Sequence, residues 1–191
     1  TQRFSDLEHR FDNGWKTKLA MNKMWGRIHM LGMYNDCYYT ACETIRQGGG
    51  KYVYTDDHSS YDAVASGPFQ LLGREHELAF GYVDSQQKFD ADTHVAQSGF
   101  GGVTNFDAYN GDFAEPAWAP RTDYGYSETR QKGLYAATRL NVTDDLKVIL
   151  GARESWYEKT SDDIYSDVSK IDVDHELTPY AGVVYDLTDN L

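Results

Sequence analysis

The side chains with the most obvious chemistry are the carboxylates that crowd the last third of the chain. Between residues 162 and 176 they flank a single histidine: Asp162, Asp163, Asp167, Asp172, Asp174, Glu176 and His175. Carboxylate oxygens are the ligands that Ca²⁺ prefers in proteins, but this spacing is not that of an EF-hand loop. A run of acidic residues is more often a solvated loop. We therefore interpret the segment as an acidic loop and predict no metal site.

Catalytic and nucleotide-binding motifs are absent from the sequence. There is no glycine-rich phosphate loop with its lysine, no His-Glu-x-x-His pair of zinc ligands and no Gly-x-Ser-x-Gly nucleophile elbow. The glycines at 99, 101 and 102 lack the strand-then-helix setting of a nucleotide site. We therefore predict that the protein is not an enzyme and has no cofactor.

The two cysteines, Cys37 and Cys42, lie close together in a tyrosine-rich stretch. Two thiols in a chain of 191 residues do not make a disulfide framework. A possible disulfide between them, or two free thiols, are both compatible with the sequence. As metal ligands they would need two further donors, which the sequence does not supply nearby.

Aromatic residues are the unusual part of the composition, with 15 Tyr, 8 Phe and 4 Trp. Large rings with polar edges make good ligand-contacting surfaces, because they bury area with little loss of entropy. The candidates that lie in or beside long polar segments are Tyr109, Trp118, Tyr124, Tyr126 and Trp156. The alternative interpretation is that each ring packs a loop or a rim.

Charge and hydropathy exclude several classes of protein. With 30 acidic and 18 basic residues the net charge is −12, which argues against a nucleic-acid partner, because such a partner requires a basic face. No run of 18 apolar residues could form a transmembrane helix. The chain starts at Thr1 with no signal peptide, so we expect a mature or internal segment.

Short turn signals alternate with long polar segments along the chain. The turns are Asp12-Asn13-Gly14, the stretch 72–75, Thr143-Asp144-Asp145 and Thr188-Asp189-Asn190, whose residue types favour tight hairpins. Long irregular segments are expected at 35–50, 86–123 and 158–172. Short turns at one end of the strands and long loops at the other end are typical of a transmembrane β-barrel.

Apolar and polar residues alternate on either side of these turns. Leu146, Val148 and Leu150 fall on one face of a strand, and residues 134–142, 78–82 and 181–187 follow the same period. Such strands suit a wall between lipid and a watery lumen, but a soluble sheet with one buried face gives the same pattern. Residues 19–33 fit an amphipathic helix slightly better than a strand.

Five segments together resemble the barrel of TonB-dependent siderophore receptors. They are 130–153 (RQKGLYAATRLNVTDDLKVILGAR), 176–190 (ELTPYAGVVYDLTDN), 66–77 (SGPFQLLGREHE), 7–15 (LEHRFDNGW) and 110–118 (NGDFAEPAW). The last is similar to a loop of the ferric-hydroxamate and pyoverdine-like branch. The matches keep their order over nearly the whole chain, and the resemblance overrides the helical interpretation of 19–33.

The resemblance implies an all-β fold, an antiparallel up-and-down transmembrane β-barrel of about 22 strands around a plug. About seven strands are expected in residues 1–191, so the chain is expected to be an internal part of the barrel domain without the plug or the C-terminal strands. The implied place is the outer membrane of a Gram-negative cell, with the barrel against lipid and the long loops extracellular.

The implied function is import of a ferric siderophore, of hydroxamate or pyoverdine-like type, energised by the TonB complex through the missing N-terminal and plug region. The siderophore's own ligands would hold Fe³⁺, and loop aromatics would pack against the chelate. The sequence leaves two alternatives open. One is a passive porin-like outer-membrane channel, and the other is a soluble secreted β domain that binds glycans through its tyrosines.

Overall fold

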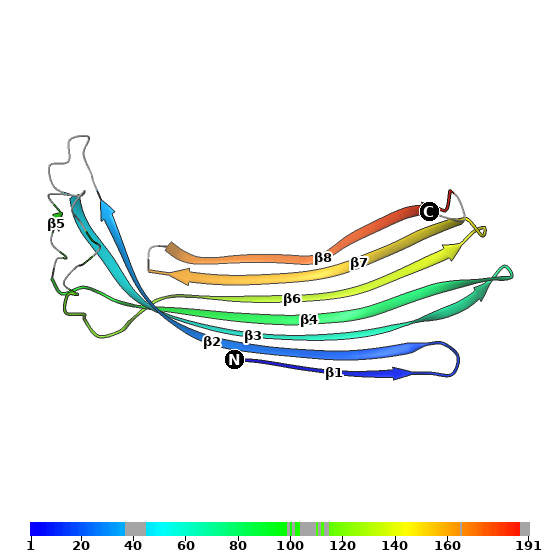
Figure 1. The fold of residues 1–191 in the computed structure, drawn as a ribbon, viewed down its shortest axis with the longest axis horizontal. Helices are drawn as coiled ribbons and strands as arrows, with labels where there is room; N and C mark the ends of the chain where they lie inside the picture. Colours follow the sequence, from blue (N-terminus) through cyan, green and yellow to red (C-terminus); the bar gives the residue numbers. More distant parts are fainter. Residues whose placement is uncertain are drawn as a thin grey trace.

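One curved antiparallel sheet accounts for nearly all of the structure (Figure 1). The structure, a computed structural model, describes residues 1–36, 45–98, 100, 102–103, 110, 112, 115–164 and 166–187. Its strands are β1 (Gln2–Arg10), β2 (Lys16–Asp36), β3 (Ile45–Leu71), β4 (Arg74–His94), β5 (Gly102–Val103), β6 (Thr122–Asn141), β7 (Leu146–Asp163) and β8 (Ser166–Tyr185). None of the described residues lies in a helix that could cross a membrane.

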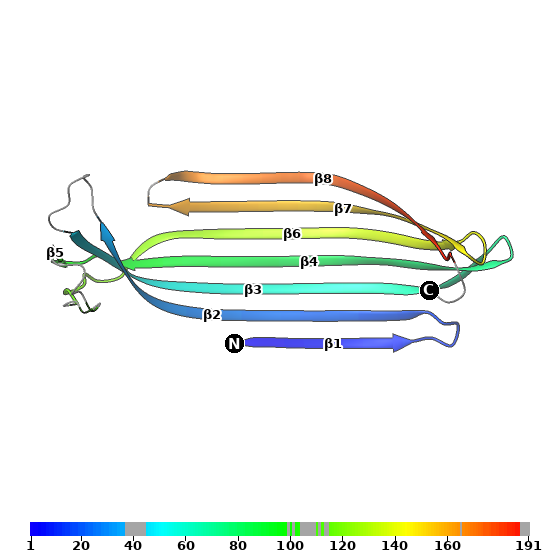
Figure 2. The same cartoon turned by 45° about the horizontal axis from the view of Figure 1, so that its top comes forward.

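The strands follow one another across the sheet almost in chain order. The path is β1-β2-β3-β4-β6-β7-β8, and the two-residue β5 pairs with the start of β3 (Figure 2). Every pairing is antiparallel, as the sequence predicts. Residues 19–33 lie inside β2, so the strand that the family resemblance favours is confirmed and the helix is wrong.

Tight turns close the sheet at one end, on the right of Figure 1. The predicted turns at 12–14 and 143–145 join β1 to β2 and β6 to β7. Leu72 and Gly73 form a two-residue turn between β3 and β4, and both have positive φ values, 54° and 76°. Positive φ at both central residues marks a type I′ turn, whose twist matches that of the strands. The predicted turn at 188–190 lies outside the described residues.

The predicted irregular segments are too long in every case. β2 reaches Asp36 and β3 starts at Ile45, which shortens the segment predicted at 35–50. β4 continues to His94 and β6 starts at Thr122, while β7 and β8 are joined around residues 164–165 instead of 158–172. These strand ends are mostly polar and their few apolar residues, such as Phe89 and Ile171, are isolated, so no alternation of hydropathy marks them as strand.

Next to the tight turns, an unbroken register gives the sheet two distinct faces. Leu19 lies opposite Ala63, which lies opposite Tyr82, so these residues share one face, which we call the band face. In the half of the sheet next to the tight turns this face carries a continuous apolar band: Leu7, Leu19, Met21, Tyr61, Ala63, Ala65, Leu78, Phe80, Tyr82, Leu134, Ala136, Leu140, Val148, Leu150, Ala152, Leu177, Ala181 and Val183. Leu19 is 56% exposed and Leu177 62%. Nothing in the chain covers this band within the described residues.

The other face, the polar face, carries charged, hydroxyl and small side chains. Asp6, Lys18, Asn22, Ser60, Asp62, Ser85, Gln131, Arg139, Arg153 and Ser155 all point there by register. Between them lie Gly81 and Gly151, which the rings of Tyr135 and Tyr180 cover so closely that an added Cβ would collide with them. Glycine at each of these two positions therefore leaves the space that a tyrosine ring of the neighbouring strand occupies.

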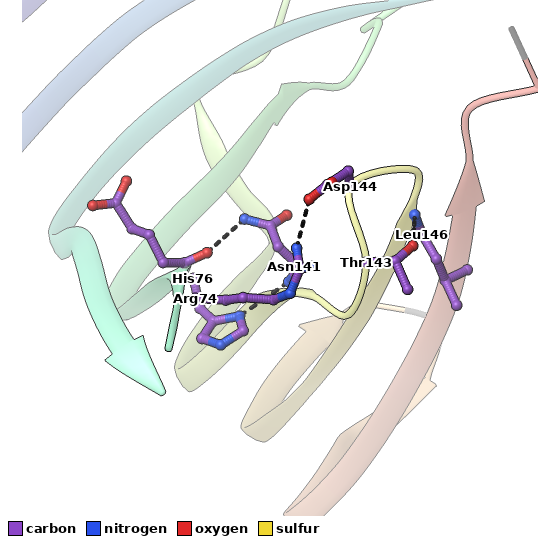
Figure 3. A network of polar contacts seen from close by, with 7 residues as sticks. Arg74, His76, Asn141, Thr143, Asp144 and Leu146 are labelled. Atoms are coloured by element: carbon purple, nitrogen blue, oxygen red, sulfur yellow. Dashed lines mark hydrogen bonds and ion pairs between the residues drawn. The ribbon is translucent and has the colours of Figure 1, made fainter. Parts of the chain in front are cut away.

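A buried histidine ties two of the tight turns together (Figure 3). His76 is 5% exposed, and its Nδ1 accepts a hydrogen bond of 3.0 Å from the backbone N–H of Asn141. Since Nδ1 accepts, Nε2 carries the proton and donates to the carbonyl oxygen of Leu71 at 2.9 Å. Arg74 adds an ion pair to Asp144, 2.8 Å from Nη1 to Oδ1. The turn after β3 and the turn after β6 are thus held side by side.

The type I′ turn predicts a stabilising substitution. Leu72 is 93% exposed and sits in the left-handed region, which costs a branched residue about 1 kcal/mol that Asn largely avoids. We expect Leu72→Asn to raise stability by roughly 0.5–1 kcal/mol in the receptor that contains this chain. Thermal unfolding in detergent measures the change. Leu71→Asn, in the adjacent strand position, serves as the control, and an equal gain there would contradict the turn argument.

Candidate functional site

The structure distributes the aromatic residues chosen from the sequence over both faces of the sheet. Tyr124 lies on the polar face, where its ring contacts that of Tyr52. Tyr126 and Trp156 lie on the band face, because Tyr126 is opposite Asp90 and Trp156 is opposite Lys132. Trp118 belongs to the segment between β4 and β6. Tyr109, Cys37 and Cys42 lie outside the described residues. A ligand contact by any of these rings remains a prediction.

Four rings from three strands meet on the polar face at the end of the sheet away from the tight turns. Tyr52 stacks on Tyr54 with ring centroids 5.8 Å apart and planes 8° apart, and Tyr54 stacks on Phe89 at 5.6 Å and 27°. Tyr124 meets Tyr52 edge to face at 5.6 Å. We call Tyr52, Tyr54, Phe89 and Tyr124 the aromatic patch. Offset and edge-to-face pairs of this kind are attractive beyond the area they bury.

Backbone features of β3, β4 and β6 bring the four rings together. Ala91 lies beneath them and is only 6% exposed. A register shift between Ala91 and Asp92 inserts one extra residue in β6, which places Tyr124 on the polar face although Tyr126 points to the band face. Gly50 leaves room for the Tyr52 ring, since an added Cβ would collide with it. The patch is therefore built on residues of β3, β4 and β6.

Two apolar residues of β2 extend the patch along the polar face. Ile28 lies opposite Tyr54 and Met30 opposite Tyr52, and they are 62% and 40% exposed. Exposed apolar side chains next to a cluster of rings make a contiguous surface of the kind that binds a ligand or a partner. The sequence shows one sign of it, the Tyr-x-Tyr spacing at 52 and 54, but Phe89 and Ile28 carry no such signal.

The segment between β4 and β6 returns to the sheet on the band face. Its two ends continue the ladder, with an isolated bridge between Ala96 and Trp118. Trp118 donates from Nε1 to Glu115 at 2.7 Å, and Lys51 lies 3.7 Å from the same carboxylate oxygen and 6.0 Å from the Trp118 ring centroid. Phe100 meets Trp118 edge to face at 5.9 Å. These contacts hold the base of the segment against Lys51 of β3.

Beyond the apolar band, the band face carries a belt of oppositely charged side chains. Lys23 pairs with Asp57, and Arg130 lies 2.8 Å from Glu128. Glu128 also accepts a hydrogen bond of 2.5 Å from Gln86. This hydrogen bond, together with the neighbouring Arg130 guanidinium, holds the pKa of Glu128 below its ordinary value of 4.5.

No arrangement among the described residues resembles a catalytic site. The described His, Cys, Asp and Glu side chains include no group of three or more placed to hold a metal ion. The acidic residues predicted to form a loop at 162–176 all lie in β7 and β8, so the prediction of an acidic loop is wrong. What the polar face offers is a binding surface: stacked rings for planar or apolar groups, and exposed polar side chains around them.

The whole chain, residues 1–191, matches the family of TonB dependent receptor-like β-barrels. The chain belongs to the TonB-dependent receptor β-barrel family. Its apolar band, tight turns and long strands are the features of one part of such a barrel. This confirms the family, the all-β fold and the absence of an enzymatic class that the sequence predicts. Members of this family are outer-membrane receptors.

Individual relatives in the family are receptors for ferric pyoverdines. The chain is 33% identical over 188 residues to the ferripyoverdine receptor of Pseudomonas aeruginosa. The matched region covers 97% of the chain and 22% of that receptor. It is 30% identical over 207 residues to the ferric-pyoverdine BN7/BN8 receptor of Pseudomonas putida, covering 99% of the chain and 25% of that receptor. The chain thus spans about a quarter of the length of these relatives.

Solved TonB-dependent receptors have the same fold. The structure of the Pseudomonas aeruginosa ferripyoverdine receptor bound to ferripyoverdine matches with a TM-score of 0.87 and 32% identity, over 98% of this chain and 25% of that one. The alcaligin receptor of Bordetella pertussis matches with a TM-score of 0.69 at 22% identity, over 98% of this chain and 26% of that one, which shows the fold alone. The barrel wall is therefore shared by receptors with divergent sequences.

The low pKa of Glu128 predicts how acid affects stability. A carboxylate whose pKa is lowered by folding stabilises the native state above its unfolded pKa, and this contribution is lost as the pH falls through the folded pKa. We expect Glu128→Gln to melt at a lower temperature than the parent at pH 7, and the gap to narrow as the pH falls below 4.5, the ordinary pKa of the carboxyl group. Melting temperatures of the detergent-solubilised receptor across this range give the result. A gap independent of pH would contradict the assignment.

Proposed function

We propose that this chain is part of the barrel wall of an outer-membrane receptor that imports a ferric siderophore of the pyoverdine class. The similarity to ferripyoverdine receptors over nearly all of the chain supports this function. The observation that carries a specific role is the aromatic patch, because it gives the polar face a place to bind a planar or apolar part of a ligand.

The orientation follows from the two faces of the sheet. Exposed leucines and aromatic rings on the band face suit contact with lipid, and the polar face then lines the lumen. Tight turns face the periplasm in barrels of this type, so the ends of β3, β4 and β6 that carry the patch lie toward the cell exterior. The patch would be met by a ligand that enters from the medium.

In this role the chain binds and orients the cargo and performs no covalent chemistry. The siderophore's own oxygen atoms hold Fe³⁺, so the wall does not need to supply metal ligands. Tyr52 and Tyr54 present ring faces and edges to the ligand, and Ile28 and Met30 extend the apolar contact. Energy for release into the periplasm would come from the TonB complex, acting through parts of the receptor outside this chain.

The patch and the residues chosen from the sequence make different predictions about affinity. Removing a stacked ring costs about 1 kcal/mol or more of binding, so we expect Tyr54→Ala and Tyr124→Ala each to weaken ferric-siderophore binding about fivefold or more. Trp118→Ala and Tyr126→Ala test two of the other sequence-based candidates, neither of which belongs to the patch. The equilibrium dissociation constant of the ferric siderophore, measured on each purified receptor variant, tests this prediction. Unchanged affinity in both patch variants would refute the assignment of the patch.

Uptake in cells tests the function itself. We expect a strain without the gene to lose uptake of radioactive iron from one ferric siderophore in a panel that includes pyoverdines, and loss of TonB to have the same effect. Uptake that needs the gene but not TonB would make the protein a passive porin-like channel. Unchanged uptake across the panel would exclude siderophore import, and the glycan-binding alternative would then be tested directly with labelled oligosaccharides.

A further inference from the structure

A carboxylate lies beside the aromatic patch on the polar face. Asp56 comes two residues after Tyr54 in β3, so the two side chains point to the same face. Asp56 also lies directly opposite Phe89 of β4. Its side chain is half-buried. This part of the polar face therefore presents a negative charge next to two rings of the patch.

The carboxylate of Asp56 is held in place by a neutral neighbour. Gln87 of β4 donates a hydrogen bond of 2.7 Å from Nε2 to Asp56 Oδ1. None of the ion pairs among the described residues involves Asp56. Lys159 is on the same face, but the register places it on β7, three strands away, which is about 14 Å at the usual strand spacing. The charge of Asp56 is thus positioned but not neutralised by a base of the described chain.

Open space on the β2 side of Asp56 gives a ligand access to the carboxylate. Asp56 lies opposite Gly26, and a Cβ added at Gly26 would have no heavy atom within 4 Å apart from those of its chain neighbours. Met24 and Ile28 lie on either side of Gly26 on the same face, and both side chains are exposed. We call this place the Gly26 space. It has an apolar border on β2 and a carboxylate on β3.

We propose that Asp56 binds a positively charged side chain of the ferric siderophore, an ammonium or a guanidinium, which enters the Gly26 space while the aromatic patch contacts the rest of the ligand. This inference rests on the proposed function. Oδ1 of Asp56 already accepts from Gln87, and Oδ2 accepts a charge-assisted hydrogen bond from the cation. Met24 and Ile28 contact the carbon chain that carries the cation.

The charge around the patch favours such a ligand over an anionic one. From the level of Tyr54 to that of Asp62, the polar face of β3, β4 and β6 carries two carboxylates, Asp56 and Asp62, and no lysine or arginine. A ligand without a cation would cover the half-buried Asp56 and leave its charge unpaired, which costs binding free energy. Asp56 therefore selects among siderophores that the rings alone would bind equally.

Capping the cation of the ligand tests the proposal on the unchanged protein. The probe is a ferric pyoverdine, taken from those that the receptor binds, whose peptide carries a free amine. Its counterpart is the same molecule after acetylation of that amine. We expect the purified full-length receptor to bind the acetylated form about tenfold more weakly, because the chelate is kept and only the charge is lost. Equal dissociation constants, or binding confined to pyoverdines without a cationic side chain, would overturn the proposal.

Two variants remove the complementary features of the protein. We expect Asp56→Asn to bind the free-amine form about tenfold more weakly than the parent and to bind the acetylated form as the parent does. Gly26→Leu fills the Gly26 space without a collision at Cβ and should lower affinity for the free-amine form in the same way. An equal loss for both ligand forms in Asp56→Asn would contradict the assignment of the charge.

Asp62→Asn is the matched control, because Asp62 is a carboxylate on the same face of the same strand, six residues further toward the tight turns. It should keep the parent's preference for the free amine, and loss of the preference there would overturn the proposal. Intact binding of both forms without a preference overturns this inference and leaves the proposed function standing. Failure of the parent to bind any ferric pyoverdine would overturn the proposed function, and this inference with it.

Discussion

The structure depends on one constraint: each backbone hydrogen bond must be made to a neighbouring strand, in a single register. β3 pairs without a shift along Lys51–Leu71 with β4 and along Arg46–Ser66 with β2. A slip of one residue would move every side chain of β3 to the other face. The apolar band and the aromatic patch would then both be lost. The tight turns matter because they fix this register at one end, and the buried His76 holds two of them together.

Much of the fold follows from local features of the sequence. Asp-Asn-Gly at 12–14 and Thr-Asp-Asp at 143–145 contain the residue types that tight turns require, and alternation on either side of them indicates strands with two unlike faces. The polar strand ends could not be predicted in this way. From Asp84 to Asp92, for example, every residue except Phe89 and Ala91 is polar, so the sequence has the composition of a loop although the backbone continues the ladder.

The aromatic patch could not be predicted from the sequence for a different reason. Tyr124 and Tyr126 are two residues apart, and simple alternation would put them on the same face. The extra residue in β6 opposite Ala91 and Asp92 places them on opposite faces. Tyr54 and Phe89 meet only because of the register between β3 and β4, which the spacing of residues within one strand does not reveal. The family resemblance supplied the architecture but no motif for these contacts.

The route of the chain between β4 and β6 bears on how receptors of this kind can diversify. Thr93 and Thr122 lie opposite each other, so the chain leaves the sheet and re-enters it at adjacent positions. The entropy needed to close a loop grows only slowly with its length, and doubling the loop costs about 0.6 kcal/mol. Insertions and deletions between these two threonines therefore leave the strand pairing intact. One wall can in this way be combined with many different external segments, and recognition can evolve without refolding the barrel.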